Sequence, residues 1–370
     1  MRAAACLALS VCLAFAQKTD SQQLFREAVD AQQRGNFALA VRDYRRLVQI
    51  QPNSPDLLAN LGAALVHLGR FDEAVADYRS AIKLDPKNAV IRTNLGLAFY
   101  KKGDFESAAR EFEPLYNANP NDPRIATLLG NSYVRLSRGS QAVAILTSVQ
   151  QANPDDLDID YVLGSALVGA GQVSKGAALM EKVGKLGHSA DAYLIAGSAF
   201  MKRNEYARAL PDLQAALNLN SNLPDIYSLV GVAEEQTGDS DTAEKHLRKA
   251  LDLNQNDLQA NLHLGGILYE KRDLDSARVY IQKALQIDPS STFGLYEMAL
   301  LNSKSGNPDS AVKDLEKVVQ ADPNWLQAHV ELAALYYKLH RPADGLKERQ
   351  IVDRLTAEQQ TRGPGQTQPH

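Results

Sequence analysis

Residues 55–88 read PDLLANLGAALVHLGRFDEAVADYRSAIKLDPKN, and this stretch decides how the chain folds. The leucines from Leu57 to Leu68 recur at helical spacing, which predicts a first helix. Pro55 suits the first turn of that helix, because its missing N–H has no partner there in any case. Gly69 ends the helix, since glycine adopts the left-handed conformation after a helix end without strain.

The second half of the stretch predicts another helix, over residues 72–84. It ends at Asp85 because a residue before proline, here Pro86, avoids the α conformation. Each helix has about 14 residues and is marginal alone in water, so the two must pack together. Small residues mark where their backbones approach, at Gly62, Ala74 and Ala81.

The chain contains ten copies of this stretch, which follow one another at a spacing of 34 residues except once. The eighth and twentieth positions are Gly or Ala in every copy. Glycine makes up only about 7% of an average protein, so chance does not explain this regularity. The copies start at Ser21, Pro55, Ala89, Pro123, Leu157, Ala190, Pro224, Leu258, Thr292 and Leu326.

The repeated unit resembles the tetratricopeptide repeat (TPR), whose pattern is W-x2-L-G-x2-Y, then A-x3-F, then P. The matching residues here are Leu61-Gly62, Leu65, Ala74, Tyr78 and Pro86. The resemblance implies an all-α fold, a right-handed superhelical solenoid of about ten helix-turn-helix units in which each unit contacts its neighbours.

The two ends of the solenoid are predicted at residues 21 and 358. The last copy is degenerate and continues into a charged amphipathic helix to about residue 358, as a terminal cap should. Residues 359–370 have the composition of a disordered tail.

The first 16 residues, MRAAACLALSVCLAFA, predict a secretory signal peptide. Arg2 precedes an apolar run that ends in the small-x-small pattern Ala14-Phe15-Ala16, so cleavage is expected after Ala16. The run is short for a bilayer, and no integral membrane span is expected after cleavage. The predicted location is the periplasm or outside the cell, as for an exported bacterial protein. The alternatives are an uncleaved anchor and an incorrectly assigned start.

Cys6 and Cys12 are the only cysteines, and both lie in this segment. The mature chain would therefore have no disulfide, no thiol nucleophile and no cysteine metal site. A lipoprotein anchored through Cys12 is disfavoured, because Val11 is a poor residue before a lipidated cysteine.

The sequence contains no motif that predicts catalysis. It has no P-loop, no dinucleotide-binding glycine motif after a strand, no HExxH and no G-x-S-x-G. Its 40 basic and 44 acidic residues give a net charge of −4, which argues against nucleic-acid binding. We therefore predict no enzyme activity, no catalytic residue, no cofactor and no metal.

The resemblance implies a partner surface on the concave face, at positions 2, 5, 9, 12 and 13 of the first helices. Position 13 is basic in half of the copies, and position 12 is mostly apolar or aromatic. Such a face favours an acidic or C-terminal peptide segment, although ordinary solvated helix faces would look the same. The predicted partner-binding residues are His67, Tyr100, Lys101, Asn131, Val134, Arg135, Met201, Lys202, Tyr269, Lys304, Tyr337 and Lys338.

Two specialised branches of the family are disfavoured. The carboxylate clamp of chaperone-binding members is present only as fragments, Asn94 and Arg124, with Leu128 in place of a clamp arginine. The asparagine row of O-GlcNAc transferase is matched at position 6 by Asn60 and Asn94, but the next copies have apolar residues there, from Leu128 to Leu229.

The fifth copy, residues 157–189, is one residue short and contains six glycines. Glycine inside a helix is destabilising by about 1 kcal/mol relative to alanine, so this copy is a candidate hinge. A locally irregular but well-packed repeat is the alternative.

The function predicted from these features is an exported protein–protein interaction scaffold that binds a peptide or partner protein in its concave groove. The alternative is an accessory factor for assembly of the cell envelope or for polysaccharide export. A third possibility, the TPR portion of an enzyme system, is disfavoured because no catalytic motif is present.

Overall fold

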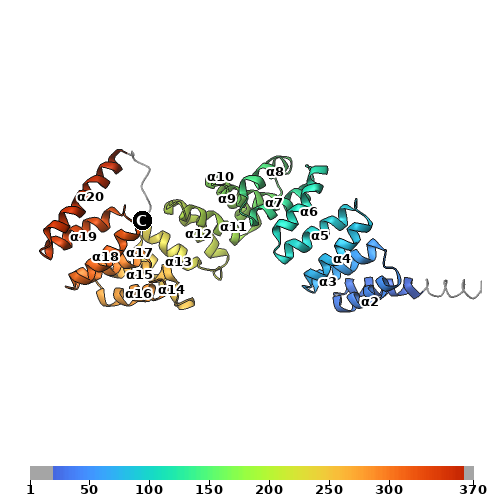
Figure 1. Ribbon diagram of the computed structural model, residues 1–370, viewed down its shortest axis with the longest axis horizontal. Coiled ribbons are helices and arrows are strands. Elements are labelled where there is room, and N and C mark those ends of the chain that lie inside the picture. Colours follow the sequence, from blue (N-terminus) through green and yellow to red (C-terminus); the bar gives the residue numbers. More distant parts are fainter. Residues whose placement is uncertain (1–19, 362–370) are drawn as a thin grey trace, which may run out of the picture. The chain divides into compact units, whose positions relative to one another are not determined.

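The computed structural model describes residues 20–361, and α-helix is the only regular secondary structure in that range (Figure 1). The all-α prediction is confirmed. The predicted signal peptide, residues 1–16, and the tail after residue 361 lie outside the described residues.

The chain divides into two compact units, Met1–Leu179 and Met180–His370, and α10 (Val173–Gly187) crosses the boundary. In the first unit, residues 20–33 are helical. They are followed by α2 (Phe37–Ile50), α3 (Pro55–His67), α4 (Phe71–Leu84), α5 (Ala89–Lys102), α6 (Phe105–Ala118), α7 (Pro123–Arg135), α8 (Gly139–Ala152) and α9 (Leu157–Gly169).

The second unit continues the same alternation of first and second helices. It contains α11 (Ala190–Met201), α12 (Tyr206–Leu219), α13 (Ile226–Gln236), α14 (Ser240–Leu253), α15 (Leu258–Glu270), α16 (Leu274–Ile287), α17 (Thr292–Lys304), α18 (Pro308–Ala321), α19 (Leu326–Lys338) and α20 (Pro342–Thr361).

Short polar side chains fix where the first helices begin. The Ser54 hydroxyl accepts a hydrogen bond from the Leu57 N–H, and Asp122 and Asp156 cap α7 and α9 in the same way. Gly69 follows α3 with φ of 71°, the left-handed conformation that its sequence position predicts.

One first helix begins later than its sequence copy. The seventh copy starts at Pro224, but α13 begins at Ile226. Asp225 has φ of 55°, and a residue in the left-handed region cannot belong to a right-handed helix.

The chain also differs from the prediction at its last helix. α20 continues to Thr361 instead of ending near residue 358. The residues before Gly363 include good helix formers and no proline, so nothing stops the helix at the predicted residue. α20 packs against α19, and Leu355 of α20 is buried.

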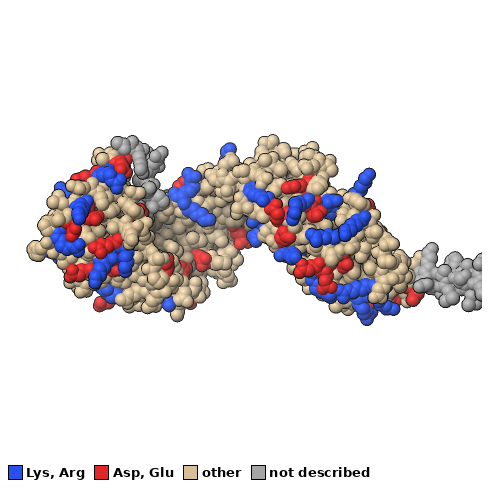
Figure 2. All heavy atoms as spheres, in the orientation of Figure 1, with Lys and Arg blue, Asp and Glu red and all other residues tan. Residues whose placement is uncertain are grey.

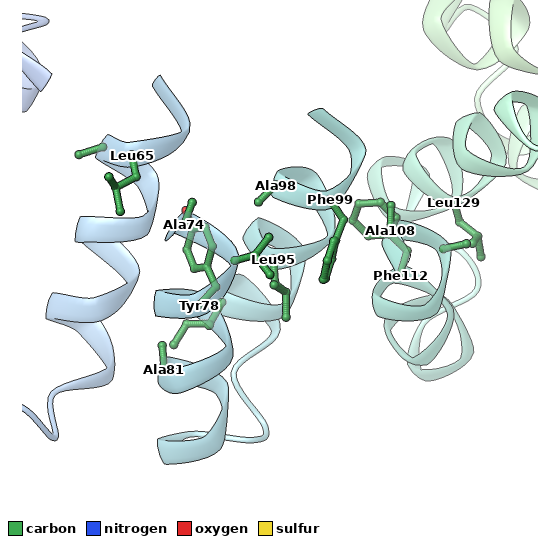
Figure 3. Packing of buried hydrophobic residues seen from close by; sticks show 14 of the residues in the cluster. Leu65, Ala74, Tyr78, Ala81, Leu95, Ala98, Phe99, Ala108, Phe112 and Leu129 are labelled. Carbon is green, nitrogen blue, oxygen red and sulfur yellow. The ribbon is translucent and has the colours of Figure 1, made fainter. Parts of the chain in front are cut away.

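The two helices of most repeats touch at positions 8 and 24. A Cβ atom added to Gly96 would lie 2.5 Å from the ring of Phe112, and one added to Gly130 would lie 2.6 Å from Leu146. Figure 3 shows Tyr78, Phe99 and Phe112 in the layers between successive helices. The residue at position 24 is buried in nine of the ten copies and exposed in the tenth, at Arg349; the buried ones are Tyr44, Tyr78, Phe112, Leu146, Met180, Leu213, Leu247, Ile281 and Leu315.

The fifth copy uses its glycines for close packing. A Cβ on Gly176 would lie 2.7 Å from the carbonyl oxygen of Gly164, and a Cβ on Gly184 would lie 2.6 Å from the ring of Tyr193. By contrast, the space beside Gly169 is open. At Gly176 and Gly184, glycine therefore has a packing role, as the alternative of a well-packed irregular repeat expects.

No helix within residues 20–361 is both long enough and apolar enough to cross a lipid bilayer.

Gly96→Ala is expected to lower the free energy of unfolding by about 1–3 kcal/mol, because the new methyl group displaces Phe112. In a Phe112→Ala background the same substitution should be neutral or stabilising by up to about 1 kcal/mol, since alanine is the better helix former. Urea denaturation followed by circular dichroism measures all four proteins. An equal effect of Gly96→Ala in both backgrounds would contradict the packing described here.

Gly176→Ala is expected to destabilise the protein by about 1–3 kcal/mol, because the added Cβ meets backbone atoms that cannot move aside. Gly169→Ala is the matched control, and it should stabilise the protein slightly because its Cβ enters open space. Hydrogen exchange over residues 169–188 gives a second measurement. Protection equal to that of the flanking repeats would exclude a hinge in the fifth copy.

Candidate functional site

The predicted partner-binding residues come from the ends of the first helices. The residues at position 13 lie at the helix C-termini and are exposed, for example His67, Lys101 and Lys338. The residues at position 12, such as Tyr100 and Met201, are half-buried because part of each side chain packs on the core. This arrangement leaves charged groups in solvent beside partly covered apolar groups.

Three of these residues meet in one pocket of the first unit. Tyr100, Lys101 and Arg135 line a pocket of about 400 Å³ together with Lys102, Gly103 and Phe105. We refer to it as the Tyr100–Arg135 pocket. The Phe105 ring lies edge-on to Tyr100, with ring centroids 5.1 Å apart, and the guanidinium of Arg135 lies 4.9 Å above the Phe105 ring.

The Tyr100–Arg135 pocket has a positive charge that its neighbours do not fully neutralise. Lys102 is paired with Asp72. Lys101 and Arg135 form no ion pair with any residue in the range 20–361. A ligand carboxylate would therefore find two available cations beside two aromatic rings.

Phe105 is a pocket residue that the sequence analysis did not identify. It is the first residue of a second helix, whereas the predicted partner-binding residues all come from first helices. The available signal was an aromatic residue at position 17, which recurs in Phe37, Phe71, Phe105 and Tyr206.

Met201 and Lys202 meet in a different pocket, which lies in the second unit and has a volume of about 510 Å³. Its apolar wall includes Leu229 and Val232 of α13, and its polar rim includes Asp257 before α15. We refer to it as the Met201–Lys202 pocket.

The structure does not gather the remaining predicted residues into either pocket. The imidazole of His67 stacks on Phe37, with ring centroids 4.2 Å apart and 2° between the planes. Tyr337 lies against Gly345 of α20, where a Cβ would be 3.0 Å from its ring. The others occupy separate places: Asn131 and Val134 are half-buried on α7, Tyr269 is half-buried on α15, and Lys304 and Lys338 are exposed at the ends of α17 and α19.

Glu235, His263 and Glu297 form a cluster that the sequence analysis did not predict, which we call the carboxylate cluster. The Nδ1 atom of His263 lies 2.5 Å from a carboxylate oxygen of Glu235. Glu297 is only 8% exposed. Within the described part of the chain, it makes no hydrogen bond or ion pair. The cluster therefore holds a buried acidic group without a partner.

The surroundings of Glu297 disfavour its charged form. Burial raises the pKa of Glu297 to about 7. The negative charges of Glu235 and Glu270 raise this pKa further, whereas His263 acts in the opposite direction. Burial also raises the pKa of Tyr296 to about 12, with smaller contributions from Glu331 and Glu297.

A sequence signal for the carboxylate cluster exists at position 6. After the apolar residues of the middle copies, this position reads His263, Glu297 and Glu331 in the last three. The partner of His263, Glu235, is at position 12 of the preceding copy. The pairing of His263 with Glu235 depends on the contact between neighbouring first helices, which the sequence of one copy does not reveal.

The face shown in Figure 2 has a mixed charge, with Lys and Arg side chains beside Asp and Glu side chains. Elsewhere in the chain, Lys271 pairs with Asp241 at 2.6 Å and with Glu244 at 2.9 Å. Across residues 20–361, no group of three or more His, Cys, Asp and Glu side chains is arranged to hold a metal ion.

Tandem helix-turn-helix units with a small residue opposite a large one define an α-helical repeat protein. The chain belongs to the tetratricopeptide repeat family, and the predicted resemblance is confirmed. The family pattern described as "Tetratricopeptide repeat" matches residues 31–76, 93–156, 161–225, 230–292 and 294–324, and the one described as "TPR repeat" matches residues 64–103. Curated protein sequences give no match.

One solved structure supports the same fold, and two others show weaker similarity. A tetratricopeptide repeat protein from Parabacteroides merdae ATCC 43184 is 18% identical, with a TM-score of 0.52 over 68% of this chain and 99% of that one. YrrB, described as a TPR protein with an unusual peptide-binding site, is 21% identical, with a TM-score of 0.41 over 50% of this chain and 95% of its own. Yeast Tom70 is 15% identical, with a TM-score of 0.38 over 94% of this chain and 98% of its own. As a member of the tetratricopeptide repeat family, the chain is built as a protein-interaction scaffold.

Glu297→Gln is expected to stabilise the protein in a pH-dependent way. The folded state holds the Glu297 proton up to about pH 7, whereas the ordinary pKa is 4.5, so the wild type loses stability as the pH rises between these values. The advantage of glutamine should be near zero at about pH 4 and reach about 2–3 kcal/mol above pH 7. Thermal unfolding followed by circular dichroism at several pH values measures it. An advantage that is constant with pH, or larger in acid, would contradict this account.

Proposed function

We propose that this protein is an exported scaffold that binds a peptide or a partner protein on the face of its first helices and has no chemistry of its own. The observation that carries the proposal is the Tyr100–Arg135 pocket. It places the available cations Lys101 and Arg135 beside the rings of Tyr100 and Phe105. Repeat arrays of this family use such surfaces to hold extended segments.

The chemistry of the pocket favours an acidic side chain or a C-terminal carboxylate as the group bound. An arginine guanidinium binds a carboxylate through two parallel hydrogen bonds, and a lysine adds a point charge. The stacking of Arg135 on Phe105 restricts the guanidinium before a ligand arrives, so less side-chain freedom is lost on binding. The Met201–Lys202 pocket offers a second apolar place with a basic group, in the second unit.

Export is proposed from the sequence of residues 1–16, which has the charge, apolar run and cleavage pattern of a secretory signal. The periplasm or the outside of the cell is then the compartment of action. An accessory role in envelope or polysaccharide-export assembly is the more specific form of the same proposal. A part in an enzyme system is disfavoured because the sequence has no catalytic motif.

Charge reversal tests the proposal. The triple variant Lys101→Glu, Arg135→Glu and Lys202→Glu should lose partners that the wild type captures from envelope extract, because like charges then face an acidic ligand. Its affinity for a labelled acidic peptide with a free C-terminal carboxylate should fall at least about tenfold, measured by fluorescence anisotropy.

The matched control is Lys83→Glu, Lys249→Glu and Lys313→Glu. These three lysines are exposed on second helices, and the control makes the same change in net charge. Equal loss of partners in both triple variants would show a general charge effect. Unchanged capture and peptide affinity in the first triple variant would reject the basic pocket as the binding site.

A further inference from the structure

We propose that the carboxylate cluster of the second unit binds the side chain of a lysine or arginine from a partner polypeptide. The inference rests on the proposed function, since it takes the face of the first helices to be a binding face. It adds a second recognition element of opposite charge to that of the Tyr100–Arg135 pocket.

The first argument is the space in front of Gly266. The site of a Cβ atom on this residue lies 3.8 Å from a carboxylate oxygen of Glu235 and 4.0 Å from one of Glu297. No other atom from outside the backbone of α15 comes closer. Two carboxylates from α13 and α17 thus face a place where α15 has no side chain.

Gly266 is also unusual in the repeat sequence. Gly266 is at position 9, and it is the only glycine at that position among the ten copies. Glycine is unfavourable inside a helix, so α15 would gain stability from alanine here. Gly266 therefore leaves room for a ligand group at the expense of helix stability.

The second argument is the missing partner of Glu297. His263 is paired with Glu235, at 2.5 Å, whereas Glu297 has no hydrogen bond or ion pair in the described part of the chain. A buried carboxylate without a partner is destabilising, and a cation that enters the site removes this penalty. Glu270 contributes further negative potential around it.

The third argument is the aromatic surround, which suits an organic cation. The ring of Phe293 lies 5.6 Å from the imidazole of His263. The ring of Tyr296 is held by stacking on Trp325, with centroids 4.9 Å apart. Ammonium and guanidinium groups are attracted to aromatic faces as well as to carboxylates. A hydrated divalent metal ion fits less well, since no three or more His, Cys, Asp and Glu side chains within residues 20–361 are arranged to hold one.

The test uses three labelled peptides of equal length, one with lysines and arginines, one with glutamates and one neutral, and measures binding by fluorescence anisotropy. The wild type should bind the basic peptide through the second unit. The double variant Glu235→Gln, Glu297→Gln should weaken that binding at least about tenfold. Gly266→Ala should weaken it too, because the methyl group occupies the place of the ligand group.

Two controls keep the result specific. Asp275→Asn with Asp309→Asn removes the same charge from exposed positions of second helices, and Gly169→Ala makes the same glycine-to-alanine change in open space. Both should leave the affinity for the basic peptide unchanged. Circular dichroism checks that each variant is folded. Equal affinity in the wild type and the glutamine double variant would overturn the inference, as would binding of spermidine or Ca²⁺ at this cluster without binding of the basic peptide.

The failures of the two proposals are distinguishable. In one outcome, the Lys101, Arg135 and Lys202 triple variant loses its captured partners, but the basic peptide binds equally well with and without the carboxylates of Glu235 and Glu297. This outcome would reject only the carboxylate cluster. In the opposite outcome, the triple variant captures the same partners as the wild type, but binding of the basic peptide requires Glu297. This outcome would reject only the basic pocket.

Discussion

In most repeats, the contact between a glycine or alanine at position 8 and a large apolar side chain at position 24 is the constraint on which the rest of the repeat depends. It brings two short helices together closely enough for each to bury its apolar stripe. Gly96 with Phe112 and Gly265 with Ile281 show how little room remains, since a Cβ would come within 2.5 Å in both cases. The same contact recurs along the chain, so one interaction maintains both the packing of the core and the spacing of the repeats.

Because the core uses one side of each first helix, the other side is free to differ from repeat to repeat. In the first unit this freedom places Lys101 and Arg135 beside aromatic rings. In the second unit it places Glu235 and Glu297 around a glycine. The charged residues of the two sites lie on first helices but at different positions and with opposite charges, so a uniform scaffold presents different chemistry at different repeats.

The repeat pattern allowed the helices, most of their first residues and the left-handed turn at Gly69 to be predicted, because these depend on local rules of helix start and stop. The late start of α13 was not predictable, since it depends on the unusual backbone of Asp225. The site was partly predictable. Tyr100, Lys101 and Arg135 follow from family positions, but Phe105 joins them from the next helix. The space that Glu297 faces depends on two neighbouring first helices at once.

A substitution at Gly266 can affect the stability of the fold and the binding site in opposite directions. Most substitutions in a repeat core lower the stability of the fold. At Gly266, a change to alanine would favour the helix while filling the space that the carboxylates face. A lineage can therefore lose this recognition element and become slightly more stable in the same step. Persistence of the glycine among descendants would then record selection for binding alone.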